Sequence, residues 1–253
     1  MTRFSEWCDC KELSLSKHKL EILTAEPLKR AHAVEVVAGS VPEHYASHSR
    51  ILDLLERLGR ESTARYLAEK LPTSLSIKSG DLGEILCSSF VAETTGFTLG
   101  IKRLRWKDHR NMSMRGEDFL GFSLGENGKS LKVLKAEVKS RASLQTSVVN
   151  EARDALSNFR ELPSAHAISF VADRLGETGN KSLQDALDDV QLKKGFRKSQ
   201  VTHMLFTFSG TNPSNMLSRN LKAYAGTVRQ HYVGIQVSGH RDFINDVFEA
   251  VEV

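Results

Sequence analysis

The residues with the clearest chemical potential are Asp118 and the run Ala136-Glu137-Val138-Lys139. On a strand, residues two positions apart point to the same side of the sheet, so Glu137 and Lys139 share a face. Carboxylates can hold a divalent cation, and a nearby lysine can hold or activate water and offset charge building on a phosphate. We therefore predict a phosphodiester-hydrolysing site with Asp118, Glu137 and Lys139 as catalytic residues.

The register of a predicted hairpin brings the two acids together. Strands are expected over about 117–124 and 131–139, joined by Asn127-Gly128, a common signal of a two-residue type I′ turn. In that register Asp118 faces Glu137, with Cβ atoms about 4.5–5.5 Å apart. Like charges this close repel, which favours a cation between them. A β-bulge in the first strand would shift the register, and a plain surface ladder is the alternative interpretation.

Mg²⁺ is the predicted cofactor, with Mn²⁺ as a substitute, because Mg²⁺ prefers a few carboxylate oxygens plus water. The predicted metal ligands are Asp118, Glu137, the backbone carbonyl of Val138 and Glu84. Glu84 is expected in the first turn of a helix over about 81–94. There it either completes the metal shell and assists catalysis or reaches back to the helix start as part of a capping box.

Basic residues gather between positions 102 and 115, where they far outnumber the acids, and the net charge of the chain is +4. Such clusters neutralise phosphates without reading base sequence, although a solvated surface carries the same charges. A glutamine at the start of the helix after the second hairpin strand could also contact phosphate or water. The predicted nucleic-acid contacts are Lys102, Arg103, Arg105, Arg110, Arg115 and Gln145.

The elements that would position this site are those of an α/β fold with the core order α-β-β-β-α-β. A mixed sheet with helices on both faces is the expected architecture. The two core helices are predicted over 81–94 and 144–159, and the four strands over 97–106, 117–124, 131–139 and 166–172. Further helices and strands alternate after residue 172 and extend or cover the sheet.

Residues 1–77 form a small leading α/β segment in this interpretation, and residues 78–253 form the catalytic domain. The leading segment is expected to hold a strand over Ala31–Ala38 and helical structure over Glu43–Leu71, with a break at Gly59. It is a candidate for docking a partner protein.

Composition bounds the remaining possibilities. Apolar residues make up 40% and charged residues 26% of the chain, which is ordinary for a soluble globular protein. No apolar run approaches the roughly 18–20 residues of a membrane span, and no secretory signal begins the sequence. The three cysteines do not form a disulfide framework. We expect a cytoplasmic protein.

Three short motifs, in their order and spacing, resemble the PD-(D/E)XK nuclease superfamily. They are Gly83-Glu84, Arg115-Gly116-Glu117-Asp118 and Ala136-Glu137-Val138-Lys139. More narrowly, Ser79–Phe159 is similar to the HamA effectors of the Hachiman anti-phage defence system. The proline of the superfamily name is absent here, as it is in many members.

This resemblance implies a PD-(D/E)XK fold, a DNA substrate, Mg²⁺ and a partner helicase of superfamily 2, HamB, that restrains the nuclease until infection or DNA damage. It also implies that Asp118 and Glu137 are metal ligands, Lys139 the catalytic lysine and Glu84 a supporting acid. The alternatives are a repair or restriction endonuclease with the same site, or a non-catalytic helicase adaptor or DNA-binding module on a decayed nuclease fold. A glycosidase that uses Asp118 and Glu137 is a distant third.

Overall fold

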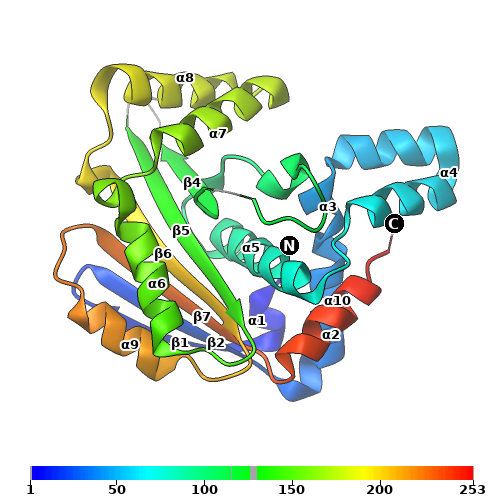
Figure 1. Ribbon diagram of the computed structural model, residues 1–253, viewed down its shortest axis with the longest axis horizontal. Coiled ribbons are helices and arrows are strands. Elements are labelled where there is room, and N and C mark those ends of the chain that lie inside the picture. Colours follow the sequence, from blue (N-terminus) through cyan, green and yellow to red (C-terminus); the bar gives the residue numbers. More distant parts are fainter. Residues whose placement is uncertain (1, 115, 126–129, 253) are drawn as a thin grey trace.

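The computed structural model describes residues 2–114, 116–125 and 130–252, and its strands form one mixed sheet (Figure 1). The sheet has seven strands in the order β1-β2-β7-β6-β5-β4-β3. The neighbours from β2 to β5 run parallel, and the pairs β1–β2, β5–β4 and β4–β3 run antiparallel. The strands are β1 Cys8–Leu15, β2 His18–Ala25, β3 Thr98–Leu99, β4 Phe119–Leu124, β5 Leu131–Arg141, β6 Val201–Ser209 and β7 Arg229–Gln236.

Helices connect and cover these strands. The α-helices are α1 Phe4–Trp7, α2 Arg30–Ser40, α3 Pro42–Tyr45, α4 His48–Lys70, α5 Leu75–Thr94, α6 Thr146–Ser157, α7 Ala165–Thr178, α8 Lys181–Asp189, α9 Ser214–Ala223 and α10 His240–Glu249. Short 3₁₀ or π turns are η1 Pro27–Lys29, η2 Arg103–Trp106, η3 Asn158–Glu161, η4 Val190–Lys194 and η5 Lys198–Gln200. None of the helices in the described residues combines the length and the apolar character that crossing a bilayer requires.

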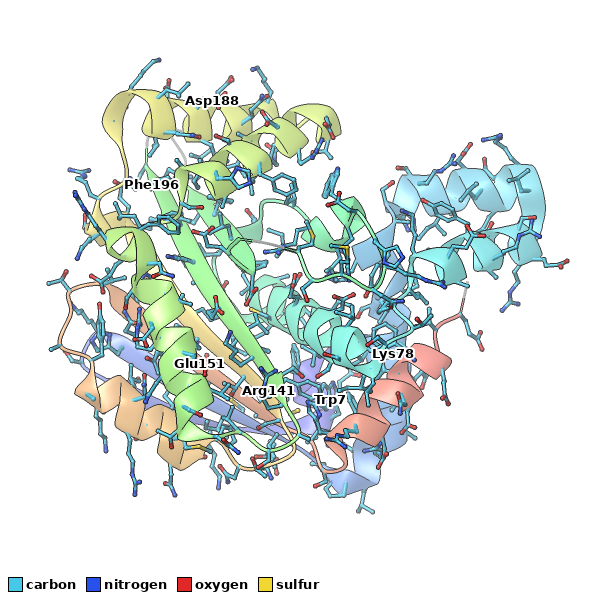
Figure 2. The ribbon with its side chains drawn as sticks, viewed as in Figure 1. Trp7, Lys78, Arg141, Glu151, Asp188 and Phe196 are labelled. Atoms are coloured by element: carbon cyan, nitrogen blue, oxygen red, sulfur yellow. The ribbon has the colours of Figure 1, made fainter. Side chains whose placement is uncertain are left out.

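Helices pack on both faces of the sheet, as predicted, because alternate strand residues are apolar in both directions. On β6, Met204 and Phe206 join the core under α5, α2 and α10, whereas Leu205 joins the core under α6 and α9. A third cluster packs α7 and α8 on β4 and the start of β5. Figure 2 shows Glu151 on α6 and Lys78 on α5 on either side of β5.

Two strand predictions are wrong. Ala31–Ala38 lies in α2, where Ala33, Val37 and Ala38 are buried at helical spacing. His166–Ala172 lies in α7 rather than forming the fourth core strand. Ile168, Val171, Ala172 and Leu175 line one face of α7, and the hydroxyl of Ser164 accepts a hydrogen bond from the amide of Ala167 at its start.

The stretch predicted as a strand over 97–106 pairs with the sheet only through Thr98 and Leu99, and Arg103–Trp106 form a 3₁₀ turn. The fourth strand of the core is β6, which follows α8 and pairs parallel with β5. The first core helix is longer than predicted, since α5 begins at Leu75.

The first 77 residues contribute to the same sheet. The hairpin β1–β2 was not predicted, because β1 is almost entirely exposed and shows no apolar alternation. β2 pairs parallel with β7 near the C-terminus, so the sheet extends across the predicted boundary. α5 also spans that boundary at residues 77 and 78. The division into two units stays a prediction.

Candidate active site at the β4–β5 hairpin

The register of β4 and β5 agrees with the prediction. Phe119 pairs with Ala136 and Leu124 pairs with Leu131, so the same register continued by one residue places Asp118 opposite Glu137. The predicted turn at Asn127-Gly128 lies outside the described residues. The hairpin therefore brings the two predicted acids to the same end of the two strands.

Asp118 stands immediately before β4, where its side chain takes the place of a main-chain partner. Its Oδ2 accepts a hydrogen bond from the backbone N–H of Val138, with 2.8 Å between oxygen and nitrogen. Burial raises the pKa of Asp118 above its usual range, against the lowering effect of this hydrogen bond and of the nearby charges of Arg103 and Lys139. The hydrogen bond thus fixes the position of the carboxylate, whereas burial makes its charged form unfavourable.

Glu137 and Lys139 share one side of β5 and bind each other. Lys139 Nζ donates to Glu137 Oε1 at 2.7 Å, and their side chains are 15% and 22% exposed, respectively. Burial raises the pKa of Glu137, and the charge of Asp118 raises it further, while Lys139 lowers it. The repulsion predicted between Asp118 and Glu137 is therefore present.

Glu84 approaches the same acids from α5. Since α5 begins at Leu75, Glu84 lies well inside the helix, and the capping-box interpretation is wrong. Burial raises its pKa to about 8; Arg103 lowers the pKa and Asp118 raises it. Arg103 Nε lies 3.6 Å from Glu84 Oε2. α5 packs closely here, since a Cβ added to Gly83 would lie 3.0 Å from Val138 Cγ1.

Asp118 is the link between the other two acids, because it raises the pKa of both Glu84 and Glu137. Across residues 2–114, 116–125 and 130–252, no three His, Cys, Asp or Glu side chains converge in a metal-binding arrangement. The donor set nevertheless suits a hard divalent cation. The predicted side-chain ligands all offer carboxylate oxygens, and Glu84 Oε2 is buried without a hydrogen-bond partner among the described residues. Lys139 forms an ion pair with Glu137 and Arg103 forms one with Glu84, and both of these carboxylates are predicted to bind the cation.

The predicted phosphate contacts mostly bind other parts of the protein. Lys102 Nζ donates to Glu43 Oε2 at 2.8 Å, and Arg105 donates to the carbonyl of Glu43. Arg103 donates to the carbonyl of Glu117, and Arg110 to that of Ala68. These contacts hold the segment after β3 against α3, α4 and the start of β4. A role in binding nucleic acid stays a prediction for these four residues.

The other two predicted nucleic-acid contacts are Gln145 and Arg115. Gln145 is exposed at the N-terminal cap of α6, which follows β5. Arg115 lies outside the described residues. Both assignments stay predictions.

Sequence reasoning missed two residues that support the site. Lys135 is buried on the same side of β5 as Glu137, and its ammonium donates to the carbonyls of Leu156, Asn158 and Leu162 at 3.0–3.3 Å. It thereby joins β5 to the end of α6. The i, i+2, i+4 spacing of Lys135, Glu137 and Lys139 was the available signal.

Glu117 is the second supporting residue that sequence reasoning missed. Its carboxylate accepts from the backbone N–H and the hydroxyl of Ser164, at 2.7 and 2.8 Å, and so ties the residue before Asp118 to the start of α7. The fixed position of Asp118 therefore depends on α7 as well as on β5.

Comparison with known proteins places this chain in a family. A model of the HamA family matches residues 1–251. A relative from Bacillus cereus, described as Hachiman protein HamA, is 25% identical over 250 residues, covering 96% of this chain and 88% of its own length.

Proposed function

This chain belongs to the HamA family, and we propose that it is a metal-dependent nuclease that hydrolyses phosphodiester bonds in DNA. We further propose that it acts as the effector of an antiviral defence system, because the Bacillus cereus relative is described as a Hachiman protein. We also propose that the core belongs to the PD-(D/E)XK superfamily, on the resemblance of its three short motifs.

One observation supports the enzymatic proposal above the others. Three carboxylates, those of Glu84, Asp118 and Glu137, all have raised pKa values, and Asp118 raises the pKa of the other two. A lysine ammonium lies 2.7 Å from one of them. Buried acids that lie beside one another destabilise the folded protein, because their charges repel each other. Such an arrangement therefore indicates a functional role. Binding of a divalent cation would relieve that repulsion.

Asp118, Glu137, Glu84 and the carbonyl of Val138 would hold Mg²⁺ or Mn²⁺, and the bound ion would supply Lewis-acid polarisation of the phosphoryl oxygen and acidification of water. The chain's own residues do the rest. The hydrogen bond from Val138 orients Asp118. Lys139, partly exposed, offers its ammonium to a phosphate oxygen or to the attacking water. Arg103 balances the charge of Glu84.

DNA would approach from the side on which Lys139 is accessible. Gln145 and the basic residues between positions 102 and 115 would contact the DNA backbone. We propose that a helicase of the HamB kind restrains this activity. The basis for that partner is family resemblance.

Plasmid cleavage tests the enzymatic proposal. Purified protein should cleave plasmid DNA in the presence of Mg²⁺ or Mn²⁺ and should stop when EDTA is added. Glu137→Gln and Lys139→Met should each lower the rate at least about 100-fold, the size of effect typical for groups that stabilise a transition state. DNA affinity, measured without a divalent cation, should change little.

Matched controls are available nearby. Lys132→Met changes an exposed lysine on the same strand, β5, and Glu151→Gln changes an exposed glutamate on α6 (Figure 2). Both should retain the full rate. Cleavage that survives Glu137→Gln together with Lys139→Met would remove these residues from the mechanism. Absence of cleavage by the wild-type protein, with and without a partner helicase, would favour the non-catalytic alternative.

A further inference from the structure

A cavity of about 250 Å³ adjoins the candidate active site. Glu84, Arg103 and Asp118 line it together with Trp106, Phe170 and Arg174. Its lining residues come largely from the chain leading from α5 to β4 and from α7. These two segments pass beside each other in Figure 1. The cavity thus joins the acids of the proposed reaction to a group of aromatic and guanidinium side chains that the reaction does not use.

That second group is arranged as a stacking surface. The rings of Trp106 and Phe170 meet edge to face, with centroids 6.4 Å apart and planes at 84°. The guanidinium carbon of Arg174 lies 5.8 Å from the centroid of Trp106 and 5.3 Å from that of Phe170. All three side chains are half-buried, so each keeps surface for a ligand. Aromatic rings with an adjacent arginine stack well on planar heterocycles.

The cavity wall also carries unsatisfied polar atoms. In the described part of the chain, six buried side-chain nitrogen or oxygen atoms have no hydrogen-bond partner, and four of them belong to residues that line this cavity. They are Glu84 Oε2, Arg103 Nε, Arg103 Nη2 and Arg174 Nε; Glu84 Oε2 and Arg103 Nε face each other as an ion pair at 3.6 Å, which is too long for a hydrogen bond. Because a buried polar atom without a partner is destabilising, their concentration here points to a ligand with polar edges as well as flat faces.

We propose that this cavity binds a single unpaired nucleobase of the DNA strand whose phosphate lies at Asp118 and Glu137. A base has the two features that the wall requires, a π-face for Trp106 or Phe170 and polar edge atoms for the unpartnered groups. The volume lies just below the roughly 300–1,000 Å³ of small-molecule pockets, so it admits one ring system and excludes a base pair. The inference rests on the proposed function, and it adds that the enzyme reads the strand in unpaired form.

The test uses the two tryptophans of the chain. Trp7 is fully buried and donates to the carbonyl of Thr2, whereas Trp106 is half-buried and lines the cavity. A short single-stranded oligodeoxynucleotide, added in EDTA so that no cleavage occurs, should quench the fluorescence of Trp106. An abasic sugar-phosphate strand of equal length should not quench it and should bind about tenfold more weakly. Trp106→Phe should remove the signal.

Variants separate stacking from general charge. Phe170→Ala and Arg174→Gln should each weaken binding of a dye-labelled oligodeoxynucleotide about tenfold, with little effect on the abasic strand. Tyr66→Ala is the matched control, since Tyr66 also lies beside two cations, Arg50 and Lys70, but on α4 and away from the cavity. It should bind like the wild type.

Equal affinity of the wild-type protein for the base-bearing and abasic strands would overturn the proposal, and this comparison needs no variant to fold. An equal loss from Tyr66→Ala and Phe170→Ala would overturn it as well. Mg²⁺-dependent plasmid cleavage is scored separately. Base-dependent binding without cleavage would reject the proposed function and keep the base site, whereas cleavage without base-dependent binding would reject the base site alone.

Discussion

The carboxylate of Asp118 accepts a hydrogen bond from the backbone N–H of Val138, the residue between Glu137 and Lys139. A side chain thereby continues the β4–β5 ladder beyond Phe119, where the main-chain pairing begins. The same contact orients the acid and fixes β5 at the site. Charge and hydrogen bonding at Asp118 can therefore be separated by mutation.

Asp118→Asn should abolish cleavage while leaving the fold intact. The asparagine oxygen can still accept from Val138, but the negative charge for a cation is gone. Asp118→Ala should also lose cleavage, and its free energy of unfolding should fall by a further 1 to 3 kcal/mol or so, because the Val138 amide loses its partner. Plasmid cleavage and urea unfolding of the two variants provide the measurement. Equal stability of the two variants would show that the hydrogen bond is dispensable.

Lys135→Met should destabilise the protein without removing a reacting group. The substitution leaves three carbonyl oxygens, at the end of α6 and beyond η3, without their shared donor. We expect a loss of about 2–4 kcal/mol in the free energy of unfolding. Lys132→Met, on the same strand but exposed, should change stability by less than about 0.5 kcal/mol. A similar small effect at Lys135 would mean that water satisfies those carbonyls equally well.

The hairpin register was predictable because its two determinants are local. A turn signal and two-residue alternation specify which residues face each other, and Phe119 to Leu124 pair as expected. The order of the elements from α5 to α6 followed from the same patterns, whereas the fourth core strand did not. The resemblance to the HamA family was confirmed, since the family model matches residues 1–251. The roles of Asp118, Glu137 and Lys139 stay predictions.

The errors arose where tertiary packing decides between helix and strand. The run His166–Ala172 is short and apolar, and its β-branched residues favour a strand, but α7 buries Ile168, Val171 and Leu175 against the core. β1 shows the opposite problem, since it forms by pairing with β2 at an exposed edge and needs no apolar face. The cavity beside the acids could not be predicted either, because it joins Trp106 to residues of α7 distant in sequence.

Gly59→Ala should destabilise the protein through backbone conformation alone. Gly59 has φ 77° where α4 turns back on itself, as the sequence predicted, and an added Cβ would meet no atom within 4 Å. We expect a loss of about 1–3 kcal/mol in the free energy of unfolding. Gly39→Ala is the matched control, because Gly39 also has open space but lies in α2 with ordinary helical backbone. That variant should gain about 0.5–1 kcal/mol. Thermal unfolding of both variants distinguishes backbone strain from crowding.

His203 should make the protein lose stability in mild acid. It is fully buried; its Nδ1 accepts from Arg153 Nη2 at 2.8 Å, and its Nε2 donates to the carbonyl of Glu161 at 2.9 Å. Burial, together with the charge of Arg153, lowers the pKa of His203 from 6.5 to about 3. A proton on Nδ1 would remove the acceptor and place two cations side by side.

The lowered pKa determines the direction of the effect. Above pH 6.5 the imidazole is neutral in both the folded and unfolded chains, and its contribution to stability is complete. Between pH 6.5 and about 3 the unfolded chain binds a proton that the folded chain resists, so stability falls by up to about 1.4 kcal/mol per pH unit. His203→Gln can still accept from Arg153 and donate to Glu161, but it does not titrate. Between about pH 7.5 and about pH 5, wild-type unfolding free energy should therefore fall by about 1–2 kcal/mol more than that of the variant. Parallel pH profiles would mean that the folded protein accommodates a protonated His203.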